Sequence, residues 1–211
     1  MAFGDSLKSF AAPATFPRGL AFDGANLWNV DSATDRVYCI DRNNGAAIRS
    51  FTVAAIDTEP RGLTSDGEYL WMSGDQNDRI YCIDPSTGEL VDSFPWPAAN
   101  LLGLGFDGKN LISAGYSGPG QIVWIGRATG AMVRNVASTT RITDLAFDRK
   151  DIYAVIEVLT VVDILYKYSI DIELIDRVTL INTYSTGLTF DEKNLWLSDG
   201  TANLIYCISV N

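Results

Sequence analysis

Residues 17–51 read PRGLAFDGANLWNVDSATDRVYCIDRNNGAAIRSF, and residues 60–94 read PRGLTSDGEYLWMSGDQNDRIYCIDPSTGELVDSF. The same frame returns at 101–136, at 142–178 and, shortened, at 185–210. A repeat of about 40 to 50 residues with several short strands in each unit is typical of a β-propeller, with one blade per repeat. One aspartate marks the frame, at intervals of 43, 41, 41 and 43 residues: Asp23, Asp66, Asp107, Asp148 and Asp191.

Each repeat divides into four short strands separated by polar turns. In the first repeat, Asp23-Gly24 and Asn44-Gly45 are dipeptides that favour tight hairpins. Segments such as Tyr81-Cys82-Ile83 are apolar at consecutive positions. Because successive side chains of a strand point to opposite faces of a sheet, both faces must be covered. Stacking of blade on blade covers them.

The fifth repeat stops after its third strand. Its missing fourth strand is supplied by the N-terminal segment 4–10, GDSLKSF, which matches GELVDSF at 88–94. We therefore predict one all-β domain over residues 1–211, a five-bladed β-propeller with four antiparallel strands per blade. The closing N-terminal strand removes an exposed sheet edge. The predicted blades are 17–51, 60–94, 101–136, 142–178, and 185–210 together with 4–10.

The pattern GLAFD–LWV–IYxIDPxTG resembles the broad group of propellers that includes NHL, YVTN and streptogramin-lyase-like proteins, and the resemblance covers essentially the whole chain. It implies the fold and says little about activity, since many functions share this scaffold. The five-bladed architecture is also similar to plant-type glutaminyl cyclase. The Phe-Thr-Gln-Gly-Leu segment of those enzymes is absent, so their catalytic residues have no counterparts here.

The composition of the chain disfavours or excludes several classes of function. The formal net charge of −10 disfavours a nucleic acid or an anionic membrane surface as partner. The sequence has no histidine, which removes Ser-His-Asp catalysis, Cys-His catalysis and His-ligated zinc. Because no signal peptide is visible and three cysteines share one repeat position on different blades, we expect unpaired thiols and a cytoplasmic location.

The resemblance implies that ligands bind around the central channel, on the face formed by the loops between second and third strands and by the blade connections. We call this the loop face. At the start of strand one the repeats align Arg18, Arg61, Leu102, Thr143 and Thr186. Arg18 and Arg61, on neighbouring blades, could grip a carboxylate or a phosphate. Alternatively, they pair with nearby acids such as Asp57 or Glu59.

Asp144 stands where the other four repeats have glycine. An acid near the channel axis would serve as a cation ligand or a general base, or would be a solvated rim residue. The loops between strands two and three carry oxygen-bearing side chains in two blades. Calcium takes such ligands, although these residues could instead bond their own turns or pair with Arg36 and Arg79. The possible calcium ligands are Asp31, Asp35, Asp75, Asn77 and Asp78.

Two further features point to ligands or partners. Trp96 and Tyr116 could stack on a planar ligand, although Trp96 could instead cap its blade. Repeat four has a longer loop with apolar side chains, which either contact a partner or extend and bury the strands. These side chains are Val158, Leu159, Val161 and Val162.

We therefore expect a non-catalytic propeller that binds a protein or a small molecule on its loop face, with no cofactor other than possible calcium. We expect it to be a monomer or to self-associate weakly. The alternative is an enzyme that uses the channel without histidine, such as a glutaminyl-cyclase-like aminoacyltransferase with Asp144 or Glu157 as its acid.

Overall fold

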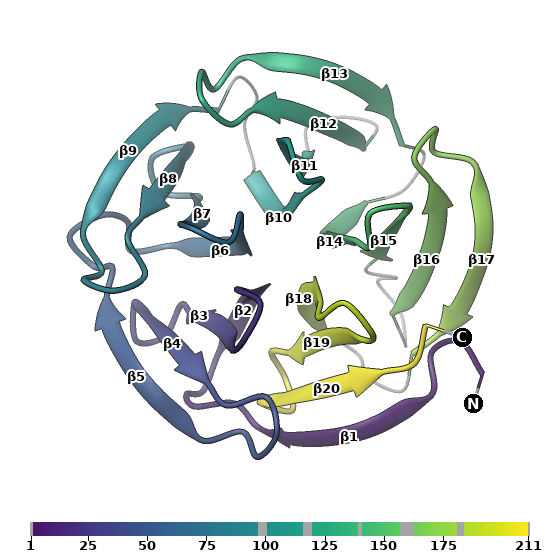
Figure 1. The fold of residues 1–211 in the computed structure, drawn as a ribbon, viewed down its shortest axis with the longest axis horizontal. Coiled ribbons are helices and arrows are strands. Elements are labelled where there is room, and N and C mark those ends of the chain that lie inside the picture. The colour runs from purple at the N-terminus through teal and green to yellow at the C-terminus, as the bar shows by residue number, and fades with distance from the viewer. Residues whose placement is uncertain are drawn as a thin grey trace.

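The computed structural model describes residues 2–96, 101–115, 120–138, 141–156, 163–180 and 184–210. Within these residues, β-strands form five four-stranded antiparallel sheets arranged as blades around a central channel (Figure 1). The first strand of each blade lies nearest the centre and the fourth forms the rim. The fold is the predicted five-bladed β-propeller.

The strands follow the chain blade by blade. Blade 1 contains β2 (Pro17–Phe22), β3 (Leu27–Asp31), β4 (Arg36–Ile40) and β5 (Ala47–Thr52). Blade 2 contains β6 (Pro60–Ser65), β7 (Leu70–Gly74), β8 (Arg79–Ile83) and β9 (Leu90–Pro95). Blade 3 contains β10 (Leu101–Phe106), β11 (Asn110–Gly115), β12 (Gln121–Gly126) and β13 (Met132–Ala137). Blade 4 contains β14 (Ile142–Phe147), β15 (Asp151–Ile156), β16 (Ile164–Ser169) and β17 (Leu174–Thr179).

Blade 5 is built from both ends of the sequence, as predicted. It contains β18 (Ser185–Phe190), β19 (Leu195–Asp199), β20 (Leu204–Ile208) and, as its rim strand, β1 (Ser6–Ala11). β1 runs antiparallel to β20, with Phe10 opposite Ile205. The Phe10 ring also lies 5.6 Å from the ring of Trp196, so β1 contributes side chains to the core as well as backbone hydrogen bonds.

The buried apolar side chains of the described residues form clusters between neighbouring blades. Trp28 of blade 1 and Tyr81 of blade 2 share one cluster, and Trp196 of blade 5 and Leu20 of blade 1 share another. A strand that is apolar at consecutive positions therefore contributes side chains to two clusters, one on each face of its sheet. Cys39, Cys82 and Cys207 are buried free thiols in these clusters. No helix of the described residues is long and apolar enough to cross a membrane.

The aspartate that marks the repeat locks strand one to strand two. In blade 2, the Asp66 carboxylate accepts hydrogen bonds from the backbone N–H of Glu68 and Tyr69, from the Trp71 indole and from Arg127. The last three of these are each 2.7 Å long. Burial alone would raise the pKa of Asp66, but these donors outweigh burial and hold the pKa below its usual value.

We expect Asp66→Asn to lower the free energy of unfolding at pH 7 by about 2 kcal/mol, because a charged acceptor of several bonds is lost. A depressed folded-state pKa stabilises the protein above the unfolded pKa of about 4, and that stabilisation is lost as pH falls through the folded value. The gap between wild type and variant should therefore close in acid. Urea unfolding at pH 7 and pH 3 measures it. Exposed Asp92→Asn is the control, and an equal effect of the two variants would refute the assignment.

Candidate functional site

The first strands of the five blades surround the centre of the ring (Figure 1), and residues at their two ends line one cavity on each face; we call these two openings the mouths of the channel. Each first strand begins at the loop face and ends at the turn that leads into strand two. We call the face that carries these turns the hairpin face. The first strand of every blade also has a register irregularity near its start, between Pro17 and Leu20 in blade 1 for example. Such irregularities re-aim side chains, here beside the loop-face mouth.

The loop-face mouth holds a cavity of about 40 Å³. The structure brings together there all five side chains that the repeat alignment singled out: Arg18, Arg61, Leu102, Thr143 and Thr186. Three further residues complete the lining: Arg141, Tyr184 and Ser185. We refer to Arg18, Arg61 and Arg141 together as the arginine mouth. Sequence reasoning missed Arg141 and Tyr184, which lie just before β14 and β18 and outside the aligned frame.

The two predicted arginines differ in their partners. Arg61 forms an ion pair with a nearby acid, as the alternative role required, but the acid is Asp75, at 2.7 Å, and not Asp57 or Glu59. Arg18 donates hydrogen bonds to the hydroxyls of Ser32 at 3.3 Å and Tyr184 at 3.4 Å. Its guanidinium also lies 4.3 Å from the centre of the Phe16 ring. Among the described residues, Arg18 has no carboxylate within ion-pair distance.

The electrostatics of the mouth favour an anion. Burial and the neighbouring positive charge of Arg61 lower the pKa of the Arg18 guanidinium, although an arginine stays charged at neutral pH. Asp75, which pairs with Arg61, offsets part of this effect, and an anionic group beside Arg18 would remove more of the cost of its burial. The mouth is thus a cationic spot in a protein whose formal net charge is −10.

Asp144 lies at the axis but turns its carboxylate to the protein backbone. The side chain is 0% exposed. Its oxygens accept hydrogen bonds from the N–H groups of Leu145 and Leu188, each at 2.8 Å, so it ties blade 4 to blade 5. Burial raises the pKa of Asp144 well above its usual value, against the opposing effect of these amides. The Asp144 carboxylate therefore links two blades and has no contact with solvent.

The five possible calcium ligands do not share a centre. Asp31 is buried and accepts hydrogen bonds from backbone N–H groups of its own loop and of Phe16. Asp75 pairs with Arg61, and Asn77 donates to Asp57. Asp35 and Asp78 occupy left-handed turn positions with φ of 48° and 50°. No group of three His, Cys, Asp or Glu side chains in the described ranges could hold a metal ion, and calcium binding stays a prediction.

Of the aromatic and apolar candidates, Trp96 is the one that the described residues include. Trp96 is 6% exposed and belongs to the cluster between blades 2 and 3, the position that its alternative role as a cap requires. Because so little of its surface is exposed, its ring offers little area for stacking with a ligand. The remaining candidates lie outside the described residues: Tyr116, Val158, Leu159, Val161 and Val162.

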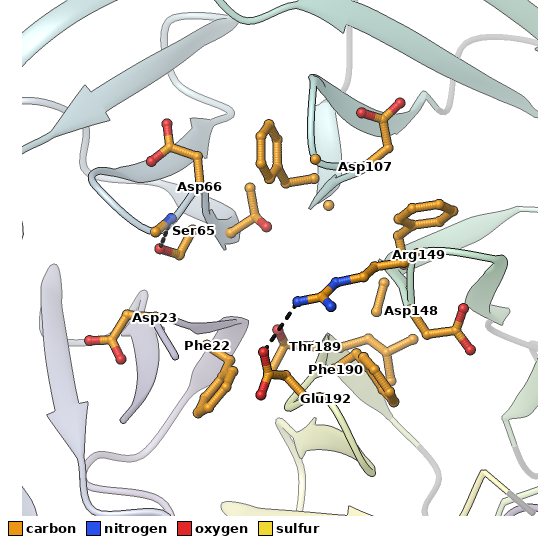
Figure 2. A pocket seen from close by; sticks show the side chains of 18 of the residues that line it. Phe22, Asp23, Ser65, Asp66, Asp107, Asp148, Arg149, Thr189, Phe190 and Glu192 are labelled. Carbon is orange, nitrogen blue, oxygen red and sulfur yellow. Dashed lines mark hydrogen bonds and ion pairs between the residues drawn. The ribbon is translucent and has the colours of Figure 1, made fainter. Parts of the chain in front are cut away.

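The hairpin-face mouth holds a second and larger cavity, of about 410 Å³, that sequence reasoning missed (Figure 2). Its rim differs between blades at one turn position. Blades 1 to 3 have Gly24, Gly67 and Gly108 there, whereas blades 4 and 5 have Arg149 and Glu192. This departure from the repeat is the sequence feature that could have pointed to the cavity.

Comparisons with known proteins match this chain by fold only. No protein-family model and no curated protein matches the chain. Glutaminyl cyclase from Myxococcus xanthus matches with a TM-score of 0.77 at 13% identity, over 97% of this chain and 95% of that one. A chain of the mitotic checkpoint complex gives 0.53 at 18% identity, covering 91% and 63%. BamB from Moraxella catarrhalis gives 0.49 at 16%, covering 95% and 61%.

Sequence identities this low show that the fold is shared, and they do not show a shared function. The chain spans less than two thirds of the latter two proteins. Membership of the NHL, YVTN or streptogramin-lyase-like group stays a prediction. The repeat, the five sheets around one channel and the nearly full-length match to a solved propeller agree: the chain is a five-bladed β-propeller.

Proposed function

We propose that this propeller is a non-catalytic binding module whose ligand presents a carboxylate group to the arginine mouth on the loop face. The observation that carries the proposal is the convergence of Arg18, Arg61 and Arg141 on one small cavity, with Arg18 held beside a second cation. Arginine is the residue type suited to this task, since its planar fork matches a carboxylate in geometry and charge.

The size of the cavity favours a carboxylate over a larger anion. About 40 Å³ has room for about three water molecules. A carboxylate has three heavy atoms, whereas a phosphate has five. The rest of the ligand would lie outside the mouth, on the loop face. A free organic acid and the C-terminus of a partner protein offer the same chemistry.

Arg18→Met should weaken carboxylate binding by about tenfold to a hundredfold, the effect of one lost charged hydrogen bond or bidentate pair. Titration calorimetry at low salt would use succinate, benzoate, and triglycine with a free or amidated C-terminus. The two triglycines separate a chain terminus from a free acid. Arg177→Met makes the same charge change on exposed β17 and serves as the control.

Equal affinity of wild type and Arg18→Met for every carboxylate would overturn the proposal, as would an equal loss in Arg177→Met. Arg18→Lys should bind with intermediate affinity, because it keeps the charge and loses the fork. Turnover of an N-terminal glutaminyl peptide by the wild-type chain would instead favour the enzyme alternative.

A further inference from the structure

The cavity on the hairpin face is a second candidate site, at the opposite mouth of the channel from the arginine mouth (Figure 2). Its base includes Leu145, Leu188 and Ala146, all buried. Its walls are phenylalanines from the ends of four first strands: Phe22, Phe106, Phe147 and Phe190. Each ring is partly exposed, and blade 2 has Ser65 in the same place, which leaves a gap in the aromatic ring.

Most charged groups around this cavity serve the fold. Figure 2 shows the side chains of Asp23, Asp66, Asp107 and Asp148 pointing away from the centre. Each accepts hydrogen bonds from the backbone of its own turn. These aspartates lie behind the phenylalanine rings, and their carboxylates do not face the cavity.

Arg149 and Glu192 behave differently. Figure 2 shows both pointing to the centre of the cavity, where Arg149 donates a hydrogen bond to Glu192 at 3.2 Å. Their φ angles are 78° and 74°, in the left-handed region that the glycines of blades 1 to 3 adopt. Non-glycine residues are strained there, and such strain gathers at functional sites. Two adjacent blades thus accept strain to place opposite charges in one cavity.

The ion pair itself gives little reason for that strain. The side chains of Arg149 and Glu192 are 85% and 67% exposed, and an ion pair so exposed stabilises a fold weakly. A ligand that supplied both charges could replace the pair with two charge-assisted hydrogen bonds at small cost. The apolar walls would then cover the rest of that ligand.

We propose that the hairpin-face cavity binds a zwitterion with a large apolar side chain, that is, a free α-amino acid such as phenylalanine or leucine. Its carboxylate would pair with Arg149, its ammonium with Glu192, and its side chain would lie among the phenylalanine rings. The volume of about 410 Å³ is within the range of small-molecule sites. This site is separate from the arginine mouth and does not depend on it.

Titration calorimetry and thermal melts of the whole chain would use L-phenylalanine, L-tyrosine, L-tryptophan, L-leucine and L-methionine. Phenethylamine lacks the carboxylate and 3-phenylpropionate lacks the ammonium, so each should bind at least tenfold more weakly than phenylalanine. Arg149→Gly and Glu192→Gly restore the residue of blades 1 to 3, so they should fold and yet lose binding at least tenfold. Arg177→Met, on the exposed rim strand β17, is the control and should leave the affinity unchanged.

Failure of all five amino acids to bind at millimolar concentration would overturn the proposal. Equal binding of phenylalanine and either one-charge analogue would do the same, because it would show that one of the two charges plays no part. Loss of phenylalanine binding in Arg18→Met, with binding unchanged in Arg149→Gly and Glu192→Gly, would move the site to the other mouth.

Discussion

A chain that lacks residues 2–11 is expected to lose about 5 kcal/mol of folding stability, a large part of the 5–15 kcal/mol typical of a native protein. Without β1, β20 becomes an open sheet edge. Trp196 loses both the Phe10 ring and the Lys8 ammonium, which lies 5.0 Å from the centre of its ring. Urea unfolding followed by tryptophan fluorescence measures the loss.

The truncated chain also offers a test by complementation. A synthetic peptide of residues 2–12 should restore the unfolding midpoint when added in excess, since binding to the folded state alone stabilises it. The same peptide with Leu7 and Phe10 replaced by aspartate should not. An unchanged urea unfolding midpoint after truncation would mean that β1 adds little stability and is not needed to close the ring. Aggregation of the truncated chain is the expected side effect of its open edge.

Gly19→Ala should lower the free energy of unfolding by about 3 kcal/mol or more, a shift of about 6–12 °C in melting temperature for a chain of this size. A Cβ at this position would lie 2.5 Å from the Gly62 carbonyl carbon and 2.7 Å from the Arg61 oxygen, and closer still to the Leu63 nitrogen. These are backbone atoms of the neighbouring blade, and they cannot move aside as a side chain can.

Gly126→Ala is the matched control. There the nearest atom to the new Cβ is the Thr129 hydroxyl oxygen at 2.9 Å, at the end of a rotatable side chain. We expect that change to lower the free energy of unfolding by less than about 1 kcal/mol. Equal melting temperatures of the two variants would show that the inner strands have room to separate and that close approach of the blades does not hold the ring.

The sequence predicts the ring well because blade patterning is local. Asp23 to Trp28 is a five-residue interval, and the aspartate accepts the indole N–H within its own blade at 2.7 Å. Turn chemistry and apolar alternation act over the same short range. Once each repeat is aligned, the symmetry of the ring brings Arg18, Arg61 and Thr143 to one mouth without further information.

The contacts of single side chains were harder to predict because they cross between blades. Asp144 lies at the axis as expected, but its carboxylate accepts a hydrogen bond from the Leu188 amide of the next blade, and a register irregularity lies beside it. Arg141 lies outside the repeat frame. The hairpin-face cavity depends on Arg149 and Glu192 meeting across two blades, and no spacing along the chain reports that distance.

The pairing of β1 with β20 sets the timing of folding during synthesis. During synthesis, the partners of residues 6–11, at 204–208, follow about 190 residues later. At about 5 to 20 residues per second, that interval is about 10 to 40 s. Blades 1 to 4 have all of their strands before blade 5 does, while β1 waits unpaired with Leu7 and Phe10 uncovered. The unpaired strand edge and the uncovered apolar side chains make this interval the one in which we expect misassembly.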